Sequence, residues 1–172
     1  MQDAPYAEIP LLAKDGSIRA YARVDAADSQ EIAAYRWHRN SNGYALRSCW
    51  PDVVLMHRQL LGLSSGDGVE CDHRNRDKLD NRRANIRRVT HSQNMQNQSA
   101  QRDSSSPFRA VHWDAGRHRW RARIAVEKRY YSLGRFVDDF EAALAVERFR
   151  REHMPFAEPD PELLRRLQLS PA

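Results

Sequence analysis

A polar stretch between residues 70 and 97 gathers titratable and amide side chains at short spacing. Asp72 and His73 are adjacent in it, and Asn85 and Asn94 follow. A neutral imidazole can take a proton from water near neutral pH, and carboxylate and amide oxygens suit magnesium or manganese. A further amide can fix a histidine ring through its second nitrogen. These side-chain types are the ones needed to cleave a phosphodiester bond with one divalent metal ion.

The sequence also indicates how these side chains are positioned. The run from Thr90 to Gln93 matches a capping box, which predicts that a helix begins at Thr90 and holds Asn94 in its opening turns. Neighbours on a regular strand face opposite sides, so Asp72 and His73 can share a site only near a strand end or at a bulge. The sequence alone leaves that point open.

Each of these positions also has a simpler interpretation. An isolated Asp-His pair is usually part of a solvated loop, and asparagines in loops mostly form turns. We expect Asn81 to close a turn with Asp80, and we expect His57 to pack on an apolar helix rather than to bind a ligand. The joint spacing of the four residues, and no single residue, favours a functional site.

The N-terminal part of the chain has the pattern of short strands and hairpins. Turns at Asp15-Gly16 and Asn42-Gly43 join runs of strand-forming residues. An apolar-faced helix is predicted over Val53–Leu61, ending at Gly62. The other predicted elements are strands at 9–12 and 18–24, a helix at 28–35 and a second hairpin at 35–47.

Positive charge is concentrated in residues 99–135, which begin with a serine-rich linker at 99–106. Residues 99–135 carry nine basic and three acidic side chains, whereas the whole chain has a net charge of +5. In this stretch Arg119, Arg121 and Arg123 alternate with apolar residues, which places the arginines on one face of a strand. A helix at 138–151, with Phe140, Leu144 and Phe149, is expected to cover the apolar face. The open arginine face favours a polyanion as partner.

The composition also excludes some classes of protein. No run of about 18 apolar residues is present, so we expect no membrane span. The first five residues carry an acid and no apolar segment, so we expect no secretory signal. Two cysteines cannot form a disulfide framework, and no Cys-x-x-Cys pair is present to hold zinc.

The stretch with LMHRQLLGL and DHRNRDKLDNRRANIRRVTHSQNMQNQ resembles the His-Asn-His (HNH) homing endonucleases of phages, in particular the zinc-free group with a ββα-metal core. The resemblance implies that His73 is the general base and that Asn85 orients it. It also implies that Asp72 and Asn94 hold one divalent metal ion, Mg²⁺ or Mn²⁺, and no zinc.

The segments FRAVHW, RWRARI, YSLGRF and FEAALAVERFRREHMPFA resemble an APETALA2-type DNA-binding domain. The resemblance covers residues 107–157 and implies three antiparallel strands packed on one helix, with the sheet on DNA. The DNA-binding residues that it implies are Arg109, Arg117, Arg119, Arg121 and Arg123.

These patterns together predict an α+β protein with N-terminal mixed β-hairpins, a nuclease core and a small three-stranded antiparallel sheet packed on one helix. The expected domains are an HNH nuclease domain with a β-rich lead-in at 1–98, the linker at 99–106, the DNA-binding domain at 107–157 and an acidic, proline-containing tail at 158–172. Within the tail, a short helix is predicted over Pro161–Leu169.

The function that we expect is site-specific, metal-dependent cleavage of double-stranded DNA. The protein would act as a monomer or a DNA-assembled dimer in the cytoplasm of a bacterial or phage-infected cell. Two alternatives stay open, namely a non-catalytic DNA-binding regulator with a decayed nuclease domain, and a protein that binds or cleaves RNA.

Overall fold

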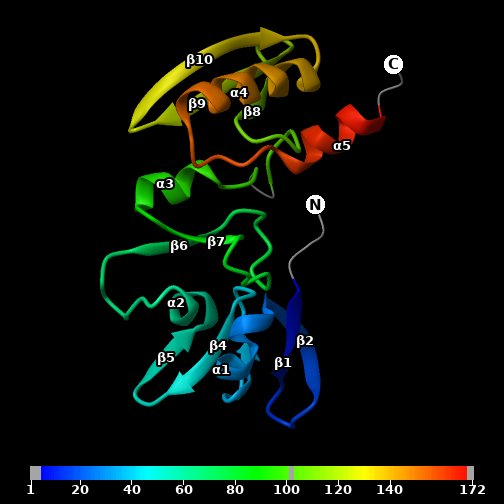
Figure 1. The fold of residues 1–172 in the computed structure, drawn as a ribbon. Helices are drawn as coiled ribbons and strands as arrows, with labels where there is room; N and C mark the ends of the chain where they lie inside the picture. The colour runs from blue at the N-terminus through cyan, green and yellow to red at the C-terminus, as the bar shows by residue number, and fades with distance from the viewer. Residues whose placement is uncertain (1–4, 101–102, 170–172) are drawn as a thin grey trace. The chain divides into compact units, whose positions relative to one another are not determined.

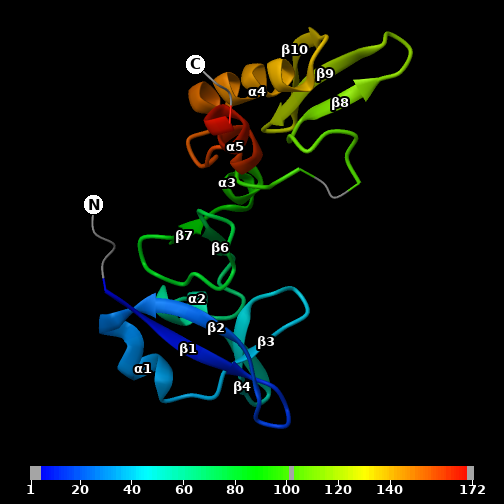
Figure 2. The ribbon, with the colours of Figure 1, turned by 90° about the vertical axis from the view of Figure 1, so that its right-hand side faces the viewer.

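The structure is a computed structural model that describes residues 5–100 and 103–169. It is an α+β fold with small antiparallel sheets and short helices (Figures 1 and 2). The chain divides into two compact units, Met1–His91 and Ser92–Ala172. The predicted linker at 99–106 lies in the second of these, and its residues 101 and 102 are outside the described residues.

The first unit begins with the predicted hairpin of β1 (Tyr6–Leu12) and β2 (Ile18–Asp25). Gly16 takes a φ of +86° in the connecting turn, a conformation that costs glycine little. Asp15 stabilises the same turn, because its Oδ1 accepts hydrogen bonds from the backbone N and the Oγ of Ser17. The turn dipeptide in the sequence was therefore sufficient to locate this hairpin.

A second sheet has the strand order β3-β4-β5. Its strands are β3 (His38–Arg39), β4 (Ala45–Cys49) and β5 (Asp52–Leu55), and η1 (Ala26–Asp28) and α1 (Ser29–Ala33) precede it. The prediction of one helix over Val53–Leu61 was wrong at its start, because residues 53–55 belong to β5 and pair with β4. The helix α2 is confined to Met56–Leu60. A short apolar run fits both structures, and pairing with β4 decides in favour of the strand here.

The core of the first unit is formed by residues from the hairpin, α1 and α2. Leu11, Val24, Ile32, Trp37 and Met56 are all at most 1% exposed. The indole Nε1 of Trp37 donates to the carbonyl oxygen of Ile32 at 2.7 Å, which satisfies the buried polar atom. This core supports the second sheet and α2 from one side.

A third, two-stranded sheet carries the predicted chemistry. β6 (Glu70–His73) pairs antiparallel with β7 (Ile86–Val89), and α3 (His91–Gln96) follows. The helix predicted from the capping box is confirmed and begins one residue after Thr90. Along the chain, two strands are therefore followed by a helix. The division between the two units falls inside α3.

The second unit contains the predicted three-stranded sheet, in the order β10-β9-β8. Its strands are β8 (Val111–Asp114), β9 (Arg119–Val126) and β10 (Arg129–Phe136), and α4 (Asp139–His153) packs on them. The side chain of Asp138 caps α4 by accepting from the backbone N of Phe140 and Glu141. Sheet and helix are both located as the sequence predicted.

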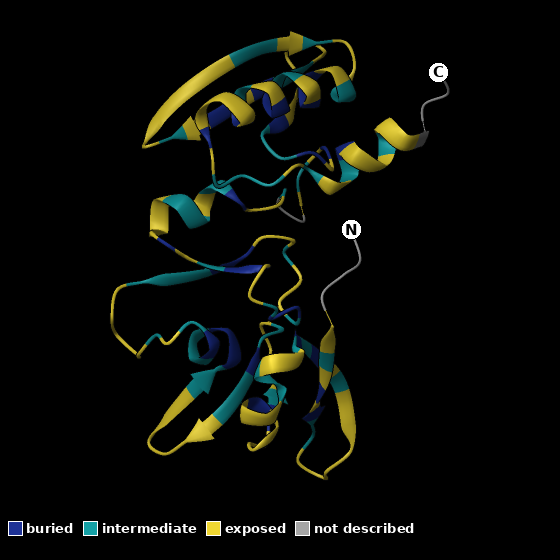
Figure 3. Cartoon of the chain, in the orientation of Figure 1, coloured by how far each residue is buried: buried dark blue, intermediate teal, exposed yellow. Residues whose placement is uncertain are grey.

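The face of α4 differs in detail from the prediction. Ala142, Ala143 and Val146 are buried in the core with Phe108 and Val111, whereas Leu144 is 38% exposed. Leu144 therefore does not cover the sheet, and small side chains let the helix approach it closely. Figure 3 shows buried and exposed residues on different sides of α4.

The tail helix α5 (Pro161–Leu169) has the predicted bounds. It is tied to α4 by an ion pair between Arg166 Nη1 and Asp139 Oδ1 at 3.0 Å, and Leu163 is buried in the core of this unit. Residues 170–172 of the predicted tail lie outside the described residues. None of the helices described in the two ranges is long and apolar enough to cross a membrane.

Candidate active site and nucleic-acid interface

Asp72 and His73 are the last two residues of β6, at the strand end that the sequence left open. Opposite them in the ladder lie Arg87 and Ile86 of β7. Both side chains are buried, with 8% and 4% of their surface exposed. After His73 the chain turns at once, because its carbonyl oxygen accepts from the backbone N of Arg76 at 2.9 Å.

The ring of His73 is held by Asn81. His73 Nε2 lies 3.2 Å from Asn81 Oδ1, and Asn81 Nδ2 donates to the carbonyl oxygen of Leu79 at 3.2 Å. A carbonyl oxygen can only accept, so the amide oxygen of Asn81 must be the atom that faces the ring. Nε2 therefore carries the proton of the neutral ring, and Nδ1 is the basic nitrogen.

The hairpin β1–β2 positions Asn81. The backbone N of Asn81 donates to the carbonyl oxygen of Arg23 at 2.7 Å, and the N of Arg23 donates to Leu79 at 2.8 Å. An ion pair between Arg23 and Asp77, 2.6 Å apart, closes the same contact. Sequence analysis favoured a turn role for Asn81. No local pattern distinguishes it from a turn asparagine, because its contact with the ring depends on how residues 74–85 fold back on β2.

Asn85, to which the resemblance assigns the orientation of His73, spans the same loop. Its Oδ1 accepts from the backbone N of Asn75 at 2.9 Å, and its Nδ2 donates to the carbonyl oxygen of Asp80 at 2.7 Å. Its carbonyl oxygen accepts from the N of Arg74, the residue after His73. These bonds fix the loop that carries Asn81, and a direct action of Asn85 on the ring stays a prediction.

A buried carboxylate anchors the middle of the loop. Asp80 is 0% exposed, and Arg82 donates to both of its oxygens at 2.8 Å. Burial by itself would raise the pKa of Asp80, but the hydrogen bonds and charge of Arg82 outweigh it and lower that pKa below its usual value. The carboxylate is therefore ionised, and Asn75 Nδ2 also donates to it at 2.9 Å.

The environment of His73 keeps its imidazole neutral. Burial lowers the pKa of His73, and the hydrogen bond with Asn81 and the negative charge of Asp72 oppose that shift only in part. A neutral imidazole is the form that accepts a proton. At pH 7 the ring can therefore act as a general base.

Two further rings enclose His73, and sequence analysis assigned neither of them to the site. His57 of α2 meets it edge to face at a centroid distance of 5.0 Å, and Tyr44 lies 5.9 Å from it and 5.2 Å from His57. His57 is 5% exposed, its Nδ1 has no hydrogen-bond partner among the described residues, and burial lowers its pKa to about 3. His57 packs on its helix as predicted, and it packs against the candidate base.

Asp72, the predicted metal ligand, is engaged by a neighbouring cation. Arg87 donates to its Oδ2 from Nε at 2.9 Å and from Nη2 at 2.6 Å. Asn94 lies in α3 beyond the division between the units, so the pairing of Asp72 with Asn94 stays a prediction. Residues 5–100 and 103–169 contain no group of three or more His, Cys, Asp and Glu side chains that could hold a metal ion.

In the second unit, the arginine row of β9 lies on the side of the sheet opposite to its core. Ala122 and Ile124 are buried, whereas Arg119 and Arg123 between and beside them are exposed. Arg121 is flanked in register by His112 of β8 and Arg135 of β10, so the row continues across the sheet. This alternation was predicted, and the structure adds Arg135 to the set. Two arginines of this surface have partners within the unit. Arg123 lies over the ring of Tyr130 at 4.1 Å, and Arg117 lies 3.6 Å from Asp114.

Arg109 differs from the other predicted DNA contacts. Its guanidinium donates to the carbonyl oxygens of Met95, Gln96 and Gln98, at 2.6 to 2.8 Å. These bonds cap the C-terminal end of α3, where free carbonyl groups favour a cation. Contact of Arg109 with DNA stays a prediction.

One known protein family matches the part of the chain that contains His73. The model of the HNH endonuclease family matches residues 55–96, which run from the end of β5 through α3. No curated protein and no solved structure matches the chain. The family match supports an HNH nuclease in this part of the chain, and an HNH endonuclease is a DNA-cleaving hydrolase.

Proposed function

We propose that the protein is a site-specific, metal-dependent DNA endonuclease of the HNH homing type. The observation that carries the proposal is the neutral, buried His73, held through Nε2 by Asn81 beside Asp72 in the matched stretch. With the proton of the neutral ring on Nε2, Nδ1 is the nitrogen that would take a proton from water. Such a base is the group that hydrolysis of a phosphodiester at neutral pH needs.

The donor set suits a hard divalent cation more than zinc. Asp72 and Asn94 would supply one carboxylate and one amide oxygen, and Mg²⁺ or Mn²⁺ commonly adds water and substrate phosphate to so small a set. Zinc sites are usually built from Cys and His ligands, and this pair of side chains supplies neither. When bound, the cation would offset negative charge on the phosphate and on the leaving oxygen.

The reaction follows from the placement of the base. His73 Nδ1 takes a proton from a water molecule whose oxygen forms a bond to phosphorus. The bond from phosphorus to the 3′ oxygen breaks, and that oxygen takes a proton from solvent. The products carry 5′-phosphate and 3′-hydroxyl ends. His57 and Tyr44 pack against the ring, and burial of the ring favours the neutral form of the base.

The test removes the base and keeps the fold. Supercoiled plasmid is incubated with the protein and Mg²⁺ or Mn²⁺, with and without chelator. His73→Ala is expected to slow cleavage by about 10²–10⁴-fold, while affinity for duplex DNA stays within a few-fold. Cleavage by the variant at nearly the wild-type rate would exclude His73 as the base.

We assign recognition of the target to an APETALA2-type module in the second unit. The arginines of β9 and its edges would contact phosphates and base edges, and Arg109 is a further candidate. They are the exposed Arg117, Arg119 and Arg123 and the half-buried Arg121. Their planar forks can form paired hydrogen bonds with guanine or phosphate. Cutting both strands would require sequential nicks or a dimer assembled on DNA.

One observation favours a second candidate, a DNA-binding regulator that does not cleave. Arg87 holds Asp72 Oδ2 through two hydrogen bonds and so competes with a cation for that carboxylate. The plasmid assay separates the two functions. A nuclease converts the plasmid to nicked or linear forms only when the metal is present, whereas a regulator shifts its mobility with and without chelator and leaves it intact.

A further inference from the structure

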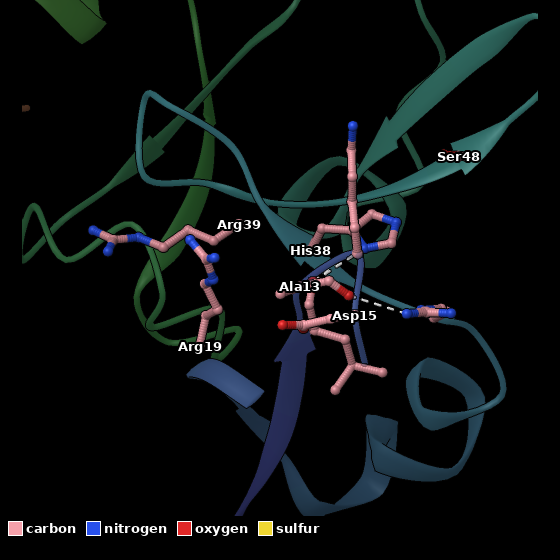
Figure 4. Close-up of a pocket in the computed structure, with 9 residues that line it drawn as sticks. Ala13, Asp15, Arg19, His38, Arg39 and Ser48 are labelled. Atoms are coloured by element: carbon pink, nitrogen blue, oxygen red, sulfur yellow. Dashed lines mark hydrogen bonds between the residues drawn. The ribbon is translucent and has the colours of Figure 1, made fainter. Parts of the chain in front are cut away.

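A basic groove lies in the first unit, on the N-terminal hairpin and the neighbouring sheet (Figure 4). It encloses about 810 Å³. We call it the hairpin groove. The residues that line it come from the β1–β2 hairpin and its turn, from the segment before β3, and from β3 and β4: Leu12, Ala13, Lys14, Asp15, Arg19, Arg36, His38, Arg39 and Ser48.

The hairpin groove carries four cationic side chains and one carboxylate, Asp15. Lys14, Arg19, Arg36 and Arg39 are all exposed, and in the described part of the chain none of them forms an ion pair. Five other arginines of the same unit each pair with an aspartate. These pairs are Arg23–Asp77, Arg58–Asp67, Arg82–Asp80, Arg83–Asp28 and Arg87–Asp72. Aspartates thus neutralise these five arginines, whereas the cationic side chains of the groove are available to an external partner.

The geometry of the groove directs these cations outward. Arg36 donates to the carbonyl oxygen of Ala13 at 3.0 Å, which fixes its side chain along the hairpin turn. In Figure 4, Arg19 of β2 and Arg39 of β3 extend to the same side of the pocket. The one acidic side chain of the lining, Asp15, accepts two hydrogen bonds from Ser17 and offsets part of the positive charge, and the four cations outnumber it. Exposed guanidinium groups on one surface suit the phosphates of a nucleic-acid strand.

We propose that the hairpin groove binds the phosphodiester backbone of the DNA substrate, as a contact of the first unit that is separate from the arginine row of β9. The inference rests on the proposed function in so far as DNA is the substrate. Contacts with phosphate position a protein on the duplex without reading its sequence. The groove would therefore set where the strand lies on the first unit, while the arginine row of β9 supplies the preference for a target.

The test measures the salt dependence of DNA binding by the full chain. Every protein carries His73→Ala, so that binding is observed without cleavage. The plot of log K against log salt has a negative slope, and each lost phosphate contact reduces the magnitude of that slope by about 0.9. Arg19→Gln with Arg39→Gln should therefore reduce the magnitude by about 1.8. The matched control removes two cations from α4, by Arg148→Gln with Arg151→Gln, and should leave the slope unchanged. If the magnitude of the salt slope fell equally in both double variants, or fell in neither of them, the proposal would be overturned.

A gain-of-charge variant keeps the test decisive if the double variant unfolds. Ser48 is exposed in the groove, and Ser48→Lys should increase the magnitude of the salt slope by about 0.9. An unchanged slope there would contradict a phosphate site. A duplex RNA of the same length is the competing partner, and loss of RNA binding alone in the double variant would assign the groove to RNA. The cleavage assay with His73 intact is independent, so absence of cleavage would refute the nuclease and leave the groove standing.

Discussion

The candidate site, which consists of the end of β6 and the loop of residues 74–85, and the sheet β8–β10 use charge in opposite ways. At the site, Asp80 is buried against Arg82, and His73 is buried and neutral. On the sheet, Arg119 and Arg123 are exposed, and one carboxylate, Asp114, receives both Arg117 and Arg135. Burial makes the first region a fixed chemical environment, whereas exposure leaves the second free to bind a polyanion. The first should therefore respond to substitution in stability and rate, and the second in affinity for DNA.

The largest effect on stability is expected at Asp80. Asp80→Ala removes the buried carboxylate that binds Arg82 and Asn75 and so the anchor of residues 74–85, which should lower the free energy of unfolding by about 3 kcal/mol. Denaturant unfolding measures it. Asp114→Ala, the matched change on the sheet, should leave the midpoint in place because exposed ion pairs contribute little. Similar losses in the two variants would remove the contrast between the regions.

The next effect concerns the rate of cleavage. Asn81→Ala removes the acceptor for His73 Nε2, so the ring loses its fixed orientation, and kcat should fall by about 10–100-fold with DNA affinity unchanged. Asn81→Asp keeps an acceptor and should retain more activity, with a pH profile shifted upwards because a carboxylate raises the pKa of the ring. An unchanged rate in Asn81→Ala would mean that Asn85 or another group orients the base.

A smaller effect is the loss of stability in mild acid. Burial lowers the pKa of His57 to about 3 in the folded protein, whereas an unfolded histidine titrates near 6.5. The unfolded chain therefore takes up a proton first, and stability falls as the pH drops below about 6.5, by up to about 1.4 kcal/mol per pH unit. Unfolding curves between pH 7 and 5 measure this slope. His57→Phe should flatten it, and an unaltered slope in that variant would exclude His57 as its source.

The smallest effect is expected from single arginines on the sheet. Arg121→Ala and Arg123→Ala should each reduce the salt slope of DNA binding by about 0.9 if each contacts one phosphate, and neither should alter the unfolding of the protein. Salt titrations of binding to a duplex measure both. A loss confined to particular base pairs, with the slope preserved, would instead indicate contact with base edges.

Elements with a regular pattern were predictable from the sequence. The alternation of β9, the turn dipeptides of the two N-terminal hairpins and the capping box before α3 each act locally, and the structure confirms the elements that they predicted. β5 was missed because residues 53–61 form one apolar run that suits either helix or strand. The pairing of β5 with β4 decides its structure, and that pairing is not a local property.

The candidate site was predictable in its chemistry and less so in its contacts. His73 and Asp72 could be singled out by type and spacing, but the bond from Asn81 and the rings of Tyr44 and His57 depend on how distant segments meet. The hairpin groove was hidden for a related reason. Residues 1–50 have no net charge, yet Asp25 and Asp28 both bind Arg83, so the balance of charge along the chain differs from its distribution in space.

The hydrogen bonds between residues 79–81 and Arg23 have a consequence for the size of the smallest active fragment. Because β2 supplies the backbone groups that hold Asn81, a truncated protein that begins near residue 55, where the family match begins, would lack the support of the amide that aligns its own base. A self-sufficient catalytic piece must therefore retain the N-terminal hairpin from Tyr6 onwards.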